Sequence, residues 1–117
     1  MQFSESLKSN RDFQQVYKNG KSYANKYLVM YVFENNKDIN RLGISVSKKV
    51  GNSVVRHRIA RLVRESYRLH ENIFNSGLDI VVIARNSAAF VHYAEIESAL
   101  LHLGKLHGII KVFFNYD

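Results

Sequence analysis

The sequence predicts a single-domain α+β fold, an α/β sandwich in which helices pack on a mixed sheet. Segments with the apolar spacing of amphipathic helices are interleaved with short apolar or alternating runs that are typical of strands. The chain has 117 residues, which is enough for one hydrophobic core. No internal repeat, low-complexity tract or linker interrupts it, so we expect one domain over residues 1–117.

The N-terminal part predicts a helix followed by a strand. Ser9, with Asp12 three residues later, is a variant of the capping box, and Gly20 is a C-terminal stop. The first helix is therefore expected to run to about Asn19. Residues 22–34 are rich in tyrosine and β-branched residues and predict one strand with two apolar faces.

The next strand, residues 41–47, separates a core face from a small polar face. Leu42, Ile44 and Val46 are expected to point into the core, while the intervening positions are polar or glycine. This small face leaves room beside Tyr31 of the preceding strand for a flat group to approach the sheet.

The second half of the chain predicts a helix, a strand and a helix. Asn52 or Ser53 caps a helix that is expected to reach Asn75, with Gly77 beyond it; residues 78–85 form a buried central strand, and a helix covers 93–107. The last segment, IIKVFFNYD, fits a strand, a helix extension or an irregular tail. The residues alone thus give the order helix, strand, strand, helix, strand, helix.

The positive charge of the chain lies in one stretch, residues 41–68. This stretch holds eight of the 17 lysines and arginines but one of the 10 acids, so its net charge of +7 equals that of the whole chain. Localised positive charge is the usual footprint of a nucleic-acid site. The sequence pI near 9.8 agrees with a polyanionic partner.

The predicted helix within this stretch has a basic face. At about 100° per residue, the basic side chains gather opposite the apolar ones; the basic group is His57, Arg61, Arg64 and Arg68, and the apolar group is Val55, Ile59, Leu62, Val63, Ser66, Leu69 and Ile73. An ordinary solvated helix face gives a similar pattern. However, only Glu65 interrupts the bases, and arginine binds phosphate in a bidentate manner, which favours a phosphate-binding surface.

Composition excludes several other classes of function. The chain has no cysteine, so disulfides and thiolate metal sites are excluded. No apolar run approaches the ~18 residues of a membrane span. The N-terminus lacks the apolar centre of a signal peptide, so a cytoplasmic protein is expected. Binding to a membrane surface is disfavoured because the helix needs its apolar face for the core.

The run KKVGNSVVRHRIARLVRE, residues 48–65, resembles the signature of the bacterial ribonuclease P protein subunit. In that family an Arg-Asn-Arg core follows Lys-Lys-x-Gly-Asn-[Ala/Ser]-Val and precedes Lys-Arg-x-x-Arg. Similar blocks outside the motif are Asp12-Phe13, Tyr17, Gly20, Ser22-x-Ala24-Asn25, residues 42–49 and residues 79–85. The resemblance covers almost the whole chain in matching order. Two positions depart from it: His57 replaces the usual asparagine, and Ala60 replaces the usual lysine.

The resemblance implies an activity and a fold. The protein would be the small subunit of a ribonucleoprotein endoribonuclease that removes the 5′ leader from precursor tRNA and would broaden its substrate specificity. The RNA subunit would be the catalyst, with Mg²⁺ bound to RNA, and the protein alone would be inactive. The fold would have the order α-β-β-β-α-β-α, with residues 42–49 resembling its third strand, and a left-handed βαβ crossover.

Two RNA-binding surfaces follow from the resemblance and from residue type. For the catalytic RNA we expect Lys48, Lys49, Arg56, His57, Arg58, Arg61, Arg64 and Arg68. For the precursor tRNA leader we expect Phe13, Tyr17, Tyr31, Arg41 and Ser45. Phe13 and Tyr17 also fit core positions. Unpaired bases stack on aromatic rings largely without regard to sequence, which suits leaders of varied sequence.

No catalytic or metal-binding residues are expected in the protein itself. Its five histidines show no ligand spacing with a carboxylate, and its acids are scattered rather than paired. The alternatives are a general RNA-binding accessory protein, a stand-alone nuclease and a DNA-binding regulator. The last is the weakest because no helix-turn-helix pattern precedes the basic helix.

Overall fold

The computed structural model describes residues 4–111. It has an α+β fold with a five-stranded mixed sheet, which confirms the predicted fold class. The strands are β1 (Ser4–Ser6), β2 (Lys21–Ala24), β3 (Leu28–Glu34), β4 (Asn40–Ser45) and β5 (Leu78–Ala84). The helices are α1 (Asn10–Asn19), α2 (Ser53–His70) and α3 (Tyr93–Leu106), with short 3₁₀ turns η1 (Glu71–Ile73) and η2 (Asn86–Ala88).

The sheet has the strand order β1-β4-β5-β3-β2. The pairs β1–β4 and β4–β5 are parallel, whereas β3–β5 and β2–β3 are antiparallel. Helix α2 connects the parallel neighbours β4 and β5, so it is the crossover for which the resemblance implies a left-handed sense. From α1 onward the element order is the one the resemblance implies.

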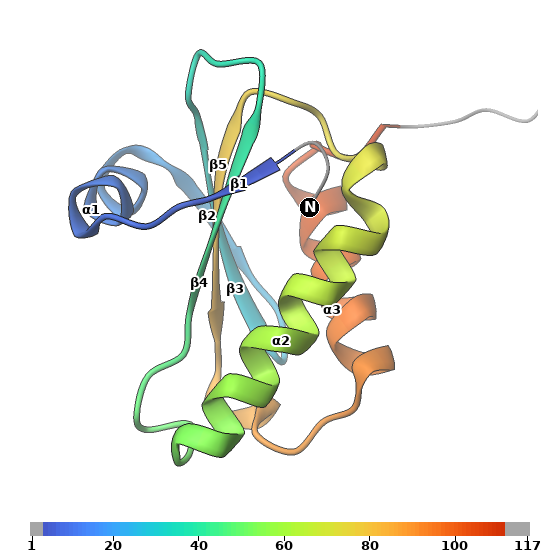
Figure 1. Ribbon diagram of the computed structural model, residues 1–117. Helices are drawn as coiled ribbons and strands as arrows, with labels where there is room; N and C mark the ends of the chain where they lie inside the picture. The colour runs from blue at the N-terminus through green and yellow to red at the C-terminus, as the bar shows by residue number, and fades with distance from the viewer. Residues whose placement is uncertain (1–3, 112–117) are drawn as a thin grey trace, which may run out of the picture.

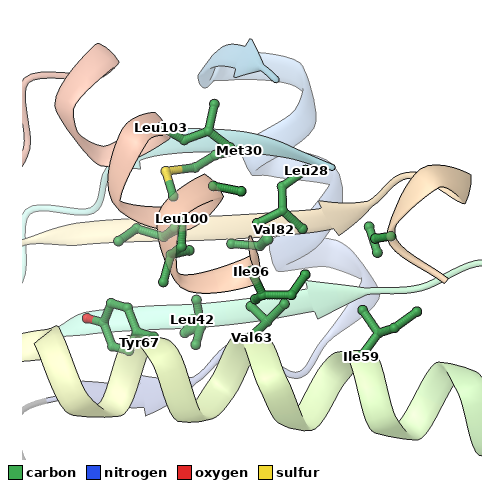
Figure 2. Packing of buried hydrophobic residues seen from close by; sticks show 14 of the residues in the cluster. Leu28, Met30, Leu42, Ile59, Val63, Tyr67, Val82, Ile96, Leu100 and Leu103 are labelled. Atoms are coloured by element: carbon green, nitrogen blue, oxygen red, sulfur yellow. The ribbon is translucent and has the colours of Figure 1, made fainter. Parts of the chain in front are cut away.

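Helices cover both faces of the sheet (Figure 1). Helices α2 and α3 lie together on one face, and α1 lies on the other. The main core fills the space between the sheet and the α2–α3 layer, as Figure 2 shows for ten labelled residues. In α2 the fully buried side chains are Ile59, Val63 and Tyr67, together with Ser66. Burying an aliphatic side chain of this size contributes about 1.5–3 kcal/mol.

A smaller apolar cluster lies under α1. Leu7, Val16 and Val81 are buried there, and partly buried aromatic side chains pack around them. The two apolar faces predicted for this part of the chain are confirmed for β3, because Tyr31 belongs to this cluster and Met30 to the main core. The two faces of the sheet therefore carry different chemistry, aliphatic toward α2 and α3 but aromatic toward α1.

The predicted single strand over residues 22–34 is wrong, because it is a hairpin of two strands. The break is set by Asn25, whose side-chain oxygen accepts the backbone N–H groups of Tyr27 at 3.3 Å and Leu28 at 3.0 Å. Such local hydrogen bonding by asparagine competes with the strand ladder and forms a tight turn. Strand β1 was not foreseen, because three polar residues at a chain end carry no apolar alternation.

The ends of the helices confirm some predictions and correct others. Ser9 caps α1 by accepting the N–H of Asp12, and Asn52 caps α2 by accepting that of Val55. Helix α2 ends at His70 rather than near residue 75.

The early end of α2 follows from pairing with the C-terminal segment. Phe74 is buried and forms an isolated β-bridge with Ile110, and the N–H of Asn75 donates to Ile109 at 2.7 Å. Residues 109–111 therefore turn back along the end of η1. The remaining part of the segment whose structure was left open, residues 112–117, lies outside the described residues.

Candidate nucleic-acid interface

The basic face of α2 is open to solvent over most of its length. His57, Arg61 and Arg64 are exposed, and Arg56 is partly buried at the start of the helix. Within residues 4–111, Arg56, Arg61 and Arg64 make no ion pair and no side-chain hydrogen bond. We call these three arginines with His57 the arginine face. Its cations have no acid within the described part of the fold to neutralise them.

Lys48 and Lys49 lie in the turn between β4 and α2 and are exposed. They precede the helix that carries the arginine face, and their role in RNA binding stays a prediction.

Two further arginines of α2 have partners inside the protein. Arg68 pairs with Glu65 at 2.5 Å, and both side chains remain nearly half exposed. The hydrogen bond from Arg68 lowers the pKa of the Glu65 carboxyl and raises that of the guanidinium. Arg58 is partly buried and donates to the backbone carbonyl of Val91 at 2.7 Å, so it tethers α2 to the segment before α3.

The buried face of α2 differs from the predicted one near the C-terminal end of the helix. Leu69 was expected to be buried but is 53% exposed, whereas Tyr67, which was not assigned to the core, is fully buried. The Tyr67 hydroxyl is hydrogen-bonded to Ser4 at 2.8 Å and to Asn40 at 3.2 Å. A tyrosine can be buried when its hydroxyl finds partners, and here β1 and β4 supply them.

An aromatic surface lies on the opposite side of the sheet, where α1 meets β3 and β4. The rings of Tyr17 and Tyr31 meet edge to face with centroids 5.1 Å apart, and Phe13 lies 6.3 Å from Tyr17. Burial raises the pKa of the Tyr17 phenol, against the opposing effect of a hydrogen bond with the Ser45 side chain. The structure thus brings together four of the five residues predicted for the leader, all of them partly buried.

Gly43 determines where Phe13 lies in this surface. A Cβ atom on Gly43 would come within 2.6 Å of the Phe13 ring. The small face predicted for β4 therefore receives the ring of Phe13 at Gly43. The adjoining side chains of Tyr17, Tyr31 and Ser45 are partly exposed.

Arg41, the fifth predicted leader residue, is held by two acids. Its guanidinium donates to both carboxylate oxygens of Asp79, at 2.8 and 2.6 Å, and to Asp12 at 3.2 Å. Asp79 is buried, and the Arg41 side chain is only 16% exposed. Because Asp12 lies in the first turn of α1, this ion-pair network fixes the start of α1 against β4 and β5.

The pKa of Asp79 reflects this network. Burial raises the pKa of its carboxyl, but hydrogen bonds from Arg41 and Asn35 outweigh burial and hold the pKa below its ordinary value. Asn35 donates to the same carboxylate at 2.9 Å. Sequence reasoning missed this role of Asp79, because one acid in an apolar strand does not reveal its partner.

The aromatic surface and the arginine face meet at the edge of β4. A cavity of about 120 Å³ lies there, lined by Phe13 from α1, Leu42 and Ile44 from β4, Arg64 from α2, and the segment of Ser6 and Leu7. Pairing of β1 with β4 stops at Leu42, so β1 does not cover the next residues of β4. The two surfaces that sequence analysis treated separately are therefore neighbours.

Across the described range 4–111, no three His, Cys, Asp or Glu side chains gather as ligands. In the same range, no helix is long and apolar enough to cross a bilayer.

The α+β fold and the positive charge that is concentrated on one helix face define a basic protein of the RNA-binding class. The family model for ribonuclease P matches residues 1–107. The ribonuclease P protein component of Lachnoclostridium phytofermentans is 70% identical over 108 residues, which cover 92% of this chain and 93% of that protein. The chain belongs to the bacterial ribonuclease P protein family. A ribonuclease P protein component implies an RNA partner and a role in processing the 5′ end of tRNA.

Solved structures agree with this assignment. The Staphylococcus aureus RNase P protein superposes with a TM-score of 0.85 at 40% identity, covering 92% of this chain and 99% of that chain. The RNase P protein from Thermotoga maritima superposes with a TM-score of 0.80 at 36% identity, covering 86% of this chain and 96% of that one. At 40% and 36% identity, the likeness includes the amino-acid sequence as well as the fold.

Proposed function

We propose that this protein binds the catalytic RNA of ribonuclease P through the arginine face and the 5′ leader of precursor tRNA through the aromatic surface. In this assignment the RNA subunit cleaves the phosphodiester bond, the protein alone is inactive, and the complex works in the cytoplasm. By holding the leader, the protein broadens the range of precursors that are cleaved.

The observation that carries the proposal is the lack of acid partners for Arg56, Arg61 and Arg64 among the described residues. The guanidinium groups of the arginine face repel one another because they carry like charges. Phosphate groups reduce this repulsion, and their oxygens accept bidentate hydrogen bonds from arginine. Lys48, Lys49, Arg58 and Arg68 extend the same surface, with fewer free donors on the last two. His57, like the asparagine usual in the family, can donate a hydrogen bond to RNA and accept one from it. Ala60 lacks the cation of the usual lysine, so this protein makes one phosphate contact fewer.

The leader role is supported by partly exposed aromatic rings. Tyr17 and Tyr31 offer partly exposed rings beside the Ser45 hydroxyl, so a base can stack there while its sugar or phosphate meets a polar group. Phe13 packs on Gly43, and its ring lies beside that of Tyr17. Arg41 forms the end wall of the surface, where its ion pairs hold α1 in place.

Magnesium enters the proposal through the RNA. When bound to the RNA subunit, it serves the hydrolysis of the phosphodiester bond. The protein residues described above bind and orient the RNA strands, and none of their roles requires a metal held by the protein.

Reconstitution tests the proposal. The protein is combined with the ribonuclease P RNA of Lachnoclostridium phytofermentans, and cleavage of a precursor tRNA is measured at low magnesium with and without protein. We expect leader removal to be faster with the protein and absent with protein alone. Cleavage by protein alone would indicate a stand-alone nuclease instead.

A second experiment addresses the accessory-protein alternative. RNA that copurifies with the protein from its host cells is sequenced. Enrichment of ribonuclease P RNA is expected; its absence, with other RNAs bound, would favour a general RNA-binding protein.

A further inference from the structure

The two most exposed large apolar side chains described in the structure belong to residues connected to Arg58 through α2 and through Val91. Phe90 is 83% exposed and Val54 is 75% exposed. Val54 precedes Arg58 by one helical turn, so both occupy the same strip of the α2 surface. Phe90 directly precedes Val91, whose carbonyl accepts the hydrogen bond from Arg58 at 2.7 Å. We call Val54, Arg58 and Phe90 the flank patch.

The turn that presents Phe90 is firmly anchored. The two preceding residues, Ala88 and Ala89, are buried in the main core. Their N–H groups close η2 on the carbonyls of Arg85 and Asn86 at 2.9 and 3.2 Å. With the tether from Arg58 on the other side, the segment is fixed at both ends. Phe90 is thus exposed on a supported turn, and its ring is already in place for a partner.

The charge around the flank patch identifies its partner. Arg58 is bonded to a neutral carbonyl, so its positive charge is not compensated by an acid among the described residues. The first turn of α2 contains no acidic residue, and Arg61 continues onto the arginine face. A partner must therefore carry both a flat apolar group and negative charge. A nucleotide combines a base with a phosphate, whereas an apolar protein segment would bring no negative charge to the guanidinium.

We infer that Phe90 stacks on an unpaired nucleobase of the same RNA that the arginine face binds. Val54 covers one side of this base, and Arg58 meets its phosphate with the guanidinium nitrogens that Val91 does not use. This inference rests on the proposed function. It extends the RNA interface around the side of α2, toward the turn between η2 and α3 (Figure 1). The added residues are Val54 and Phe90, which composition and charge do not single out.

Tryptophan fluorescence tests the inference directly, because the chain contains no tryptophan. In Phe90→Trp, the single indole keeps the ability to stack and reports on its surroundings. We expect titration with ribonuclease P RNA to quench its emission, with an affinity close to that of the wild type. The matched control is Leu106→Trp, which replaces another exposed apolar residue at the far end of α3, about 20 Å along that helix from its start. Its emission is expected to change little.

Affinity measurements provide the second arm. Phe90→Ala is expected to weaken RNA binding by roughly 5- to 140-fold, the range for losing one stacked base. The salt dependence of binding is expected to stay unchanged, because no phosphate contact is lost. Thermal unfolding is expected to match the wild type, since the ring is exposed.

Three results would overturn the inference. The first is an unchanged emission spectrum of the Phe90→Trp variant at RNA concentrations that saturate wild-type binding. The second is wild-type affinity in Phe90→Ala. The third is self-association of the protein without RNA, measured by sedimentation and abolished by Phe90→Ala, because it would make the flank patch a contact between two copies. If the wild type itself fails to bind this RNA, the proposed function fails and the inference with it; normal wild-type binding with either of the first two results removes the inference alone.

Discussion

Arg41 and Arg64 are both arginines near the edge of β4, yet their surroundings are opposite. Arg41 is nearly buried and bound to the carboxylates of Asp79 and Asp12. Arg64 is exposed and has no acid partner among the described residues. The comparison separates cations that hold the fold together from cations that remain for a partner. Counting charge in the sequence places both in one basic stretch, but only the network of partners tells them apart.

The strongest test of this comparison removes Arg41. Arg41→Leu leaves the Asp79 carboxylate buried without its main partner, so we expect the free energy of unfolding to fall by about 3–5 kcal/mol. Urea denaturation measures the loss. Arg61→Leu is the matched control on the arginine face, and its stability is expected to stay within about 0.5 kcal/mol of the wild type. Equal losses in the two variants would contradict the distinction.

The aromatic surface provides the next test. Tyr31→Ala removes a stacking partner, and we expect affinity for leader-bearing precursor tRNA to fall by about 1–3 kcal/mol, with a smaller change for mature tRNA. Binding of the reconstituted complex to both tRNAs measures the difference. Because Tyr31 is partly buried, unfolding is measured in parallel. Equal losses for the two tRNAs would argue against a leader contact.

The arginine face predicts a change in salt dependence. Arg64→Ala is expected to weaken binding to ribonuclease P RNA and to lower the slope of log affinity against log salt by about one phosphate contact. Filter binding over a range of salt concentrations measures the slope. Lys111→Ala is a suitable control, because this exposed lysine lies beyond α3 and its ammonium faces the carbonyl of Asn72. An unchanged slope in Arg64→Ala would remove Arg64 from the phosphate contacts.

The smallest expected effect concerns pH. The pKa of Asp79 is lower in the folded protein than its ordinary value of 3.8, so the ionised carboxylate stabilises the fold above that pH. This contribution is lost as the pH falls from about 4 through the lowered pKa. In Asp79→Asn, part of the acid-induced loss of stability is expected to disappear. Unfolding curves at several pH values check this, and identical pH profiles would show that Asp79 does not contribute.

Periodicity made much of the fold predictable. The caps at Ser9 and Asn52, the alternation in β3 and the position of α3 are local patterns, and the structure confirms them. The break at Asn25 was missed because a tyrosine-rich run suggests a continuous strand, while one side chain reverses the backbone. The end of α2 was missed because it depends on the C-terminal segment, more than thirty residues away.

The candidate site was predictable to a different extent. Helical spacing predicts the grouping of His57, Arg61 and Arg64 on one face of α2, and the structure bears out the exposure of all three side chains. The partners of Arg41 could not be foreseen, since Asp79 lies 38 residues away in another strand. Phe90 was also missed, because an isolated aromatic residue carries no pattern until its exposure is known. The family itself was identified from a resemblance, which charge and spacing alone could not supply.

The contact between Gly43 and Phe13 has a consequence for how relatives of this protein can vary. A side chain at position 43 needs the space that the Phe13 ring occupies. A methyl group can enter only if position 13 becomes smaller or α1 moves away from the sheet. We therefore expect that, among homologues, a non-glycine residue at 43 accompanies a residue smaller than phenylalanine at 13.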